Sequence, residues 1–163
     1  MKTSIVCVSV HHGNTWRVAS AMAEPLGIEP LEPRTVDINS LLTLDLIGFG
    51  SGIYFGRHHR SLLAFVDSLP FVAGKKAFIF STSGARNGIV QLPWCDYNRT
   101  LSRKLHQKGF ETIGEFSCRG LDTAGPWRLL GGFGRGRPST EDLQNARDFA
   151  IGLARACSGP TAI

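Results

Sequence analysis

The stretch IVCVSVHHGNTWRVASAMAEPLG, residues 5–27, decides the fold of this chain. It begins with an almost continuous run of β-forming apolar residues up to Ser9, as in a strand that is buried on both faces. A polar turn containing Gly13 follows, and apolar residues then recur at helical spacing until Gly27 supplies a stop. The stretch therefore predicts a buried strand that leads through a short turn directly into a helix.

The rest of the chain repeats this alternation of strand and helix. Strands are predicted over residues 3–10, 34–38, 44–51, 75–82 and 111–118, and helices over 14–26, 60–69, 94–109 and 138–157. Residues 39–44 leave room only for a helical turn, because a full crossover between parallel strands is longer. The pattern is typical of an α/β protein with a parallel sheet and helices on both faces, and 163 residues predict one domain, 1–163.

The composition is that of an ordinary globular protein, with 42% hydrophobic and 19% charged residues. No apolar run reaches the roughly 18 residues needed to span a bilayer, and no signal peptide is recognisable, so we expect a cytoplasmic protein without a membrane span. None of the four cysteines forms a C-x-x-C pair, and we expect no metal site. The net charge is +5, but the basic residues do not form a stripe interleaved with aromatic residues, so no nucleic-acid partner is expected.

The turn after the first strand predicts a phosphate site, because ligands of open α/β sheets bind beyond the carboxyl ends of the strands. The candidate residues are Ser9, His11, His12, Gly13, Asn14 and Thr15. Gly13 allows close backbone approach, and the helix that follows presents unpaired N–H groups with partial positive charge. The alternative is that Asn14 or Thr15 merely caps this helix.

Two further loops follow predicted strands and have related compositions. The loop after the third strand contains Ser51, Gly52, Ile53, Tyr54, Phe55 and Gly56, and the loop after the fourth contains Ser81, Thr82, Ser83 and Gly84. Glycines let backbone amides approach a flat ring, and apolar or aromatic side chains cover its face. Together with the first loop, these segments predict a rim that binds a planar heteroaromatic ring carrying a phosphate. The alternative for the third-strand loop is a glycine-rich turn whose aromatic residues belong to the core.

The segments HHGNT, DLIGFGSGIYFG and FIFSTSG, in this order and spacing, resemble those of short-chain flavodoxin-family proteins over nearly the whole length. The resemblance implies a three-layer sandwich with five parallel strands in the order 2-1-3-4-5. It also implies non-covalent FMN, with Ser9 and residues 11–15 at the phosphate and residues 51–56 and 81–84 beside the flavin. The family transfers one or two electrons, and the resemblance implies no catalytic residue in the chain.

The chain departs from the family pattern in three respects. His11 and His12 stand where the family usually has Ser or Thr, so the hydrogen bonds to a phosphate must differ in detail. No stacking tyrosine is obvious in the third loop, where Trp94 and Tyr97 are the candidates. The chain is basic, whereas typical electron-carrier flavodoxins are acidic.

Residues 119–138 form a long, basic, glycine-rich segment after the last predicted strand. Such a segment is long for a connection within a domain, and we expect it to cover the site or dock a partner; the alternative is a packed structural loop. The aromatic residues of this segment are compatible with a homodimer. Three functions are compatible with the sequence: an FMN electron carrier that serves redox partners, an FMN-dependent oxidoreductase that reduces a quinone or similar small acceptor with NAD(P)H, and an FMN-free protein-binding module.

Overall fold

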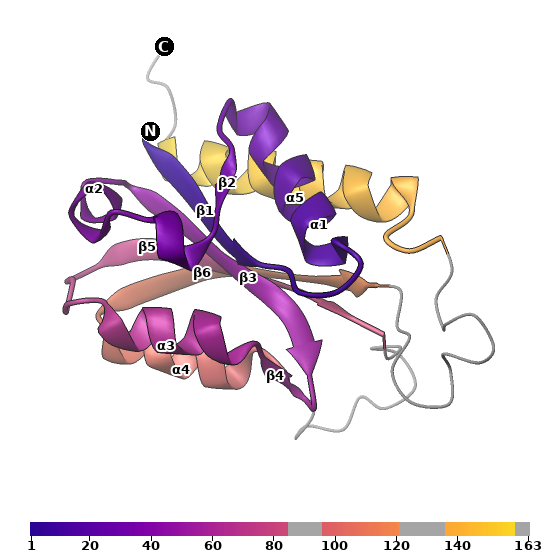
Figure 1. Ribbon diagram of the computed structural model, residues 1–163. Helices are drawn as coiled ribbons and strands as arrows, with labels where there is room; N and C mark the ends of the chain where they lie inside the picture. The colour runs from indigo at the N-terminus through magenta and orange to yellow at the C-terminus, as the bar shows by residue number, and fades with distance from the viewer. Residues whose placement is uncertain (85–95, 121–135, 159–163) are drawn as a thin grey trace, which may run out of the picture.

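The computed structural model describes residues 1–84, 96–120 and 136–158 and contains one central sheet (Figure 1). Its five parallel strands are β1 (Thr3–Val8), β2 (Pro30–Leu31), β3 (Leu46–Tyr54), β5 (Lys75–Ser83) and β6 (Phe110–Arg119). They lie in the order β2-β1-β3-β5-β6. This confirms the predicted order 2-1-3-4-5, since β5 and β6 are the fourth and fifth parallel strands. An additional short strand, β4 (Arg57–His58), pairs antiparallel with the end of β3.

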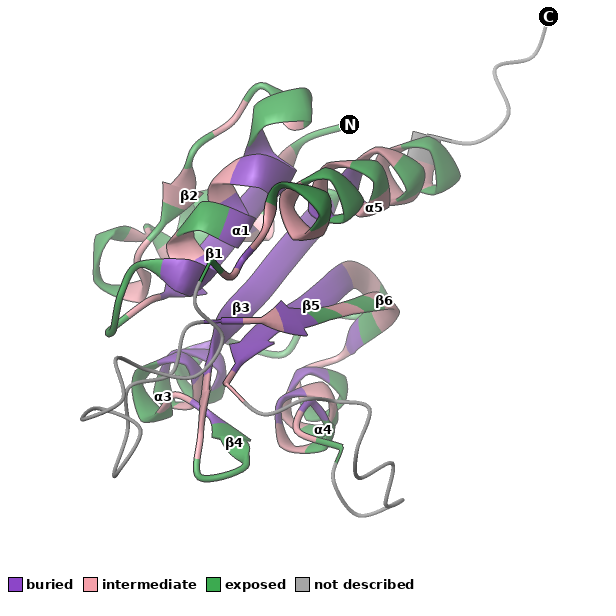
Figure 2. Cartoon of the chain, turned by 90° about the vertical axis from the view of Figure 1, so that its right-hand side faces the viewer, coloured by how far each residue is buried: buried purple, intermediate pink, exposed green. Residues whose placement is uncertain are grey.

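Helices cover both faces of the sheet, which confirms the predicted three-layer arrangement (Figure 2). Helices α1 (Asn14–Ala23) and α5 (Thr140–Ser158) pack together on one face, and α3 (Arg60–Ser68) and α4 (Arg99–Gln107) on the other. The remaining elements are the 3-10 helices η1 (Glu24–Leu26) and η2 (Pro33–Thr35) and the short helix α2 (Ile38–Leu42). Helix α2 is the helical turn that was predicted between the second and third strands.

The predicted strand over residues 34–38 is wrong. The edge strand β2 lies earlier, at Pro30–Leu31, and Pro33 begins the 3-10 helix η2. Val36 and Ile38, whose alternation with polar residues suggested a strand, are partly buried and pack on the core from irregular chain and from the start of α2. Two apolar residues spaced by two can therefore reach a core without belonging to a sheet.

The core has two halves, one on each face of the sheet. Alternate residues of β1 point to opposite faces, so Val6 and Val8 pack with α3 and α4, whereas Ile5 and Cys7 pack with α1 and α5. On the α1–α5 face, Gly48 and Gly50 of β3 are the register partners of Phe78 and Phe80 of β5. A Cβ atom at either glycine would overlap the ring of its partner, so these glycines make room for the two phenylalanines.

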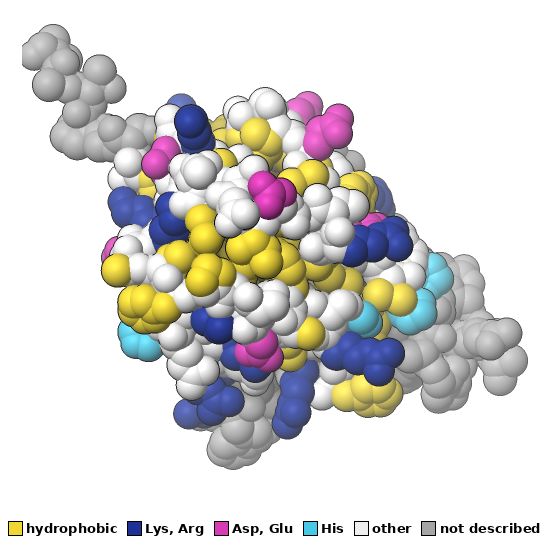
Figure 3. All heavy atoms as spheres, turned by 60° about the vertical axis from the view of Figure 1, so that its left-hand side comes forward, with side chains coloured by type: hydrophobic (Ala, Val, Ile, Leu, Met, Phe, Trp, Pro, Cys, Tyr) yellow, Lys and Arg dark blue, Asp and Glu magenta, His cyan; other side chains and the backbone are white. Residues whose placement is uncertain are grey.

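The amino-terminal edge of the sheet carries apolar side chains on its surface (Figure 3). Two shallow hollows of about 590 and 540 Å³ lie there, and both are lined by Met1 and Leu44. Lys75 and Lys76 border the first hollow, and Leu26 borders the second. No loop that is predicted to bind a cofactor contributes to either hollow.

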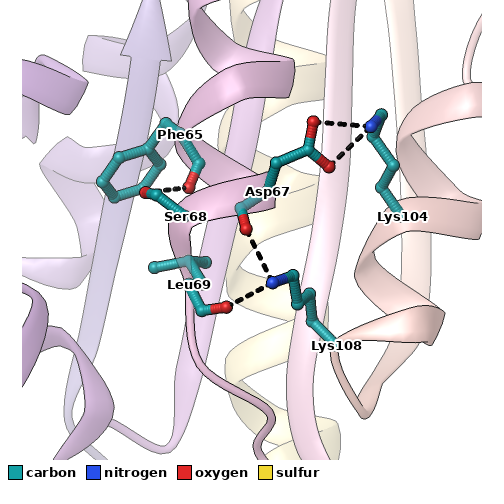
Figure 4. Close-up of polar contacts among 6 residues, drawn as sticks. All are labelled: Phe65, Asp67, Ser68, Leu69, Lys104 and Lys108. Carbon is teal, nitrogen blue, oxygen red and sulfur yellow. Dashed lines mark hydrogen bonds and ion pairs between the residues drawn. The ribbon is translucent and has the colours of Figure 1, made fainter.

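Two lysines of the α4 region hold the end of helix α3 (Figure 4). The Nζ atom of Lys108 donates hydrogen bonds to the carbonyl oxygens of Asp67 and Leu69, each at 2.6 Å. Lys104 forms an ion pair with the carboxylate of Asp67, whose side chain is 54% exposed. The carbonyl groups at the end of a helix lack intrahelical partners and carry partial negative charge, so Lys108 stabilises this end directly.

We predict that Lys108→Met lowers the free energy of unfolding by about 1–2 kcal/mol, because two carbonyl groups lose a charged donor while the aliphatic stem remains. Lys104→Met is the matched control and should cost less than about 1 kcal/mol, because its ion pair is exposed to solvent. Urea unfolding of the three proteins at pH 7 measures both values. Equal losses for the two variants would show that Lys108 contributes only as another surface charge.

Candidate functional site

Parallel pairing brings the three predicted loops to the same edge of the sheet. Val8 at the end of β1 is the register partner of Ser51 in β3, and Ser51 is in turn the partner of Ser81 in β5. Figure 2 looks onto this edge, toward which the arrowheads of the central strands point. The polar residues that follow the three strands therefore lie around one region, as the sequence predicted.

The turn between β1 and α1 has the geometry of an anion site. His12 and Gly13 both have positive φ, at 56° and 65°, and Gly13 is the N-cap of α1. Within the part of the chain that the structure describes, no side chain caps this helix, and its first turn contains no acidic residue, so Asn14 and Thr15 begin it with backbone N–H groups rather than capping it. This geometry excludes the alternative in which Asn14 or Thr15 caps α1, because Gly13 is the N-cap. The unpaired N–H groups at the start of a helix can hold an anion.

A buried hydroxyl supports a ligand at the same turn. The Oγ atom of Ser9 is inaccessible to solvent and has no hydrogen-bond partner among the residues that the structure describes. Leaving a buried hydroxyl without a partner costs free energy, and an anion held by the adjacent N–H groups would supply an acceptor. His11, His12 and Gly13 are exposed around it.

Three chain segments meet beside the start of α1. The hydroxyl of Thr15 lies 2.7 Å from that of Thr82, and both residues are buried. Gly120, directly after β6, donates its N–H to the carbonyl oxygen of Ser83, and a Cβ atom on this glycine would come within 2.9 Å of the Asn14 side chain. The hydroxyl of Ser81 pairs with that of Ser117 on β6, at 2.8 Å.

The predicted residues 81–84 differ in burial. Ser81, Thr82 and Ser83 are buried at the end of β5, with Ser81 and Thr82 bonded to neighbouring elements, whereas Gly84 is half-buried at the last described position before residue 96. A ligand would meet this segment at its carboxyl end.

The predicted residues 53–56 form the tip of a β-hairpin between β3 and β4. Tyr54 pairs with Arg57, and the two residues between them, Phe55 and Gly56, have φ of 50° and 76°. Positive φ at both central positions is typical of the type I′ turns that connect hairpins. Ile53 is half-buried, whereas the side chain of Phe55 is fully exposed.

Tyr54 joins this hairpin to the first loop. Its ring makes edge contacts with the rings of His11, at a centroid distance of 5.8 Å, and of His59, at 5.4 Å. Burial raises the pKa of the Tyr54 hydroxyl, and hydrogen bonds with the backbone of Val10 and His11 oppose this rise. The neutral hydroxyl therefore connects the two loops that are predicted to enclose the cofactor.

Four polar side chains that the sequence did not single out as a group form a chain beneath this hairpin. The hydroxyl of Ser51 lies 2.9 Å from Nδ1 of His58, whose Nε2 lies 3.0 Å from Oδ1 of Asn98. The Nδ2 atom of Asn98 donates to the carboxylate of Glu115 at 2.9 Å. The side chain of Ser51 is therefore bonded inside the protein.

His58 is 2% exposed, and this burial lowers its pKa to about 4, although Asn98 and Asp96 act in the opposite direction. The imidazole is therefore neutral at physiological pH. The buried, hydrogen-bonded position of His58 could not be predicted from the sequence, because His58 is one of two adjacent histidines and its bonding partners are distant along the chain.

Several predicted features lie outside the described residues, namely Trp94 and most of the segment 119–138. Within that segment, Arg137 forms an ion pair with Asp142 of α5 at 2.7 Å. This ion pair holds the Arg137 side chain at the start of α5. Tyr97, the other candidate for a stacking residue, is half-buried and near the hairpin, since a Cβ atom on Gly56 would lie 3.9 Å from its ring.

Neither metal ligands nor a membrane-spanning helix is found in the described part of the chain. It contains no group of three or more His, Cys, Asp or Glu side chains placed to hold a metal ion. Cys7 and Cys118 are buried, which raises the pKa of both thiols. No helix there has the length and apolar character needed to cross a bilayer.

The low pKa of His58 predicts how stability depends on pH. As the pH falls from about 6.5 to about 4, the unfolded chain binds a proton at His58 that the folded protein does not bind, so the folded state loses up to about 3 kcal/mol. His58→Gln should flatten the stability curve between pH 7.5 and 4.5. Urea unfolding at several pH values measures the slopes, and the values at pH 7.5 report the cost of the substitution itself. Parallel curves for the two proteins would contradict this assignment.

Comparison with known proteins agrees with this architecture. Residues 5–119 match the family model of the flavodoxin domain. The uncharacterized protein MJ0298 of Methanocaldococcus jannaschii is 40% identical over 157 residues, which cover 95% of this chain and 99% of that protein. A flavodoxin from the domain Archaea superposes with a TM-score of 0.66 at 18% identity, over 97% of this chain and 99% of the other.

A protein from P. pentosaceus described as an NADPH-quinone reductase superposes with a TM-score of 0.64 at 14% identity, over 92% of this chain and 98% of the other. At these identities the two structures establish the fold alone. The family model covers most of the chain and includes all three loops of the candidate site. The chain therefore belongs to the flavodoxin domain family.

Proposed function

We propose that this protein binds FMN and transfers electrons between redox partners. The observation that carries the proposal is the start of α1, where two left-handed residues and a helix without a side-chain cap face the carboxyl edge of the sheet. A phosphate would satisfy the N–H groups there and the buried hydroxyl of Ser9. The residues present therefore fit the phosphate of FMN.

The other predicted segments fit the isoalloxazine ring. Ile53 and Tyr54 are half-buried beside the phosphate turn, and the hairpin tip at Phe55 and Gly56 would lie along one side of the ring. A backbone carbonyl of this tip would accept a hydrogen bond from the flavin. Ser81–Gly84 would border the ring on its other side. When bound, FMN supplies the exchange of one or two electrons, and the loops adjust its potential through hydrogen bonds and apolar cover.

The charge of the exposed rim favours an acidic or anionic partner. Arg57 is exposed, and neither the first loop nor the hairpin contains a carboxylate. A rim of this sign attracts partners of opposite charge and accelerates their association. We also propose that the protein acts in the cytoplasm, as an electron carrier or as an enzyme.

The second candidate is an FMN-dependent oxidoreductase that reduces a quinone or similar small acceptor with NAD(P)H. The structural similarity to a protein described as an NADPH-quinone reductase favours it, as does a net charge of +5. Steady-state turnover with NADPH and a soluble quinone, without an added reductase, separates the two functions. Turnover identifies the enzyme, and its absence in FMN-loaded protein identifies the carrier.

The first test is a visible absorption spectrum of the purified protein before and after FMN is added. We expect flavin bands that remain with the protein through gel filtration. A colourless protein that does not take up FMN would overturn both redox functions and leave a protein-binding module on the same fold.

The phosphate turn makes a sharper prediction. His12→Asp should weaken FMN binding by about tenfold or more, because a carboxylate beside the start of α1 repels the phosphate, whereas riboflavin binding should change little. Aspartate tolerates positive φ and favours a helix N-terminus, so the fold should keep its stability. Quenching of flavin fluorescence measures both affinities.

Asn39→Asp is the control for this experiment. It adds the same charge at α2, which lies at the opposite edge of the sheet (Figure 1). Equal effects of the two substitutions on FMN binding would contradict a phosphate site at residues 11–15.

A further inference from the structure

A chain of hydrogen bonds runs through the protein from an exposed carboxylate to a buried serine. It begins at Glu115 on β6, passes Asn98 before α4 and His58 on β4, and ends at Ser51 on β3. The distances are 2.9, 3.0 and 2.9 Å. Asn98, His58 and Ser51 are all buried, so solvent does not compete for the two bonds that join them.

The carboxylate sets the direction of every bond in the chain. An ionised Glu115 only accepts, so the amide nitrogen of Asn98 faces it and the amide oxygen faces His58. That oxygen also only accepts, so Nε2 of the neutral imidazole carries the proton. Nδ1 is then an acceptor, and the single hydroxyl hydrogen of Ser51 is shared between Nδ1 and the carbonyl oxygen of Gly52, each at 2.9 Å. The Ser51 oxygen accepts the backbone N–H of His59 at 2.9 Å.

These bonds close the hairpin whose tip is under strain. Phe55 has a φ of 50°, a region in which turns favour asparagine, aspartate or glycine. Its side chain is fully exposed, so contacts of the ring do not hold this conformation. Strained backbone persists only where the surroundings impose it. Ser51 precedes the tip and His58 follows it, so the bond between them ties the two sides of the hairpin together.

We propose that His58 is a positioning residue for the flavin site: oriented by Glu115 through Asn98, it fixes Ser51 and thereby holds the hairpin tip Tyr54–Gly56 in the shape that the flavin meets. The inference rests on the proposed function, because it names the device that shapes one wall of that site. Glu115 acts through two other residues and is the only member of the chain that is exposed.

The imidazole tautomer of His58 tests the direction of the chain without any cofactor. Long-range ¹H–¹⁵N NMR spectra of the protein at pH 7 should show the Nε2–H form. Glu115→Gln should convert part of the population to the Nδ1–H form, because a glutamine at this position can donate as well as accept. Glu111→Gln is the matched control, since Glu111 is an exposed carboxylate on the same strand, and it should leave the spectrum of His58 unchanged.

The same variants test the role in the site. Glu115→Gln should raise the Kd of FMN by about threefold to tenfold and shift its midpoint potential, because the hairpin tip is no longer held in one shape. Removing a negative charge would by itself lower the Kd of the anionic FMN. The expected rise in the Kd is therefore opposite to a simple electrostatic effect. Glu111→Gln should change the Kd by less than about twofold.

The outcomes separate this inference from the proposed function. An Nδ1–H tautomer in the wild-type protein, or an equal Kd and potential for the two glutamine variants, would overturn the inference while FMN binding stands. A wild-type protein that shows the Nε2–H tautomer but binds no FMN would overturn the proposed function and, with it, the role of His58 toward a flavin.

Discussion

Parallel pairing is the constraint on which the rest of the structure depends, because it sends the carboxyl ends of β1, β3 and β5 to one edge of the sheet. These strands are buried along most of their length, so polar groups are admitted mainly where the strands end. The two edges consequently differ. One collects hydroxyls, histidines and an open helix start, and the other carries apolar side chains and a lysine that holds the end of α3.

The candidate site sets locally strained turns on this rigid base. Four of its residues have positive φ: His12, Gly13, Phe55 and Gly56. Phenylalanine is not a residue that such a backbone favours, and it costs free energy there. Stability and function are thus assigned to different parts of the chain. The sheet and its two apolar faces supply the stability. The turns, which are held by bonds from neighbouring elements, supply the function.

Most of the fold was predictable because its signals are local. Buried strands such as β1 appear as apolar runs, and the start of α5 is marked by Ser139 and Asp142, which bond to each other. The strand order followed from the resemblance to a family. The prediction failed at residues 34–38, where an alternating pattern belongs to a 3-10 helix and the approach to α2.

The site was predictable only as a set of loops. Their place after the strands follows from the topology, but the roles of individual side chains depend on contacts between distant segments. Ser51 was predicted to lie beside the flavin, and the sequence did not indicate that its hydroxyl bonds to His58, which is linked through Asn98 to Glu115. No spacing in the sequence reveals that these residues meet, because β4 and the start of α4 bring them together.

The glycines of β3 limit how this sequence can diverge. Gly48 and Gly50 lie opposite Phe78 and Phe80, and neither glycine has room for a methyl group while the ring beside it is present. A single substitution at either glycine displaces an aromatic side chain from the α1–α5 face of the core. A larger residue at one of these glycines therefore requires a smaller residue at its partner, so each glycine and its phenylalanine form one steric unit.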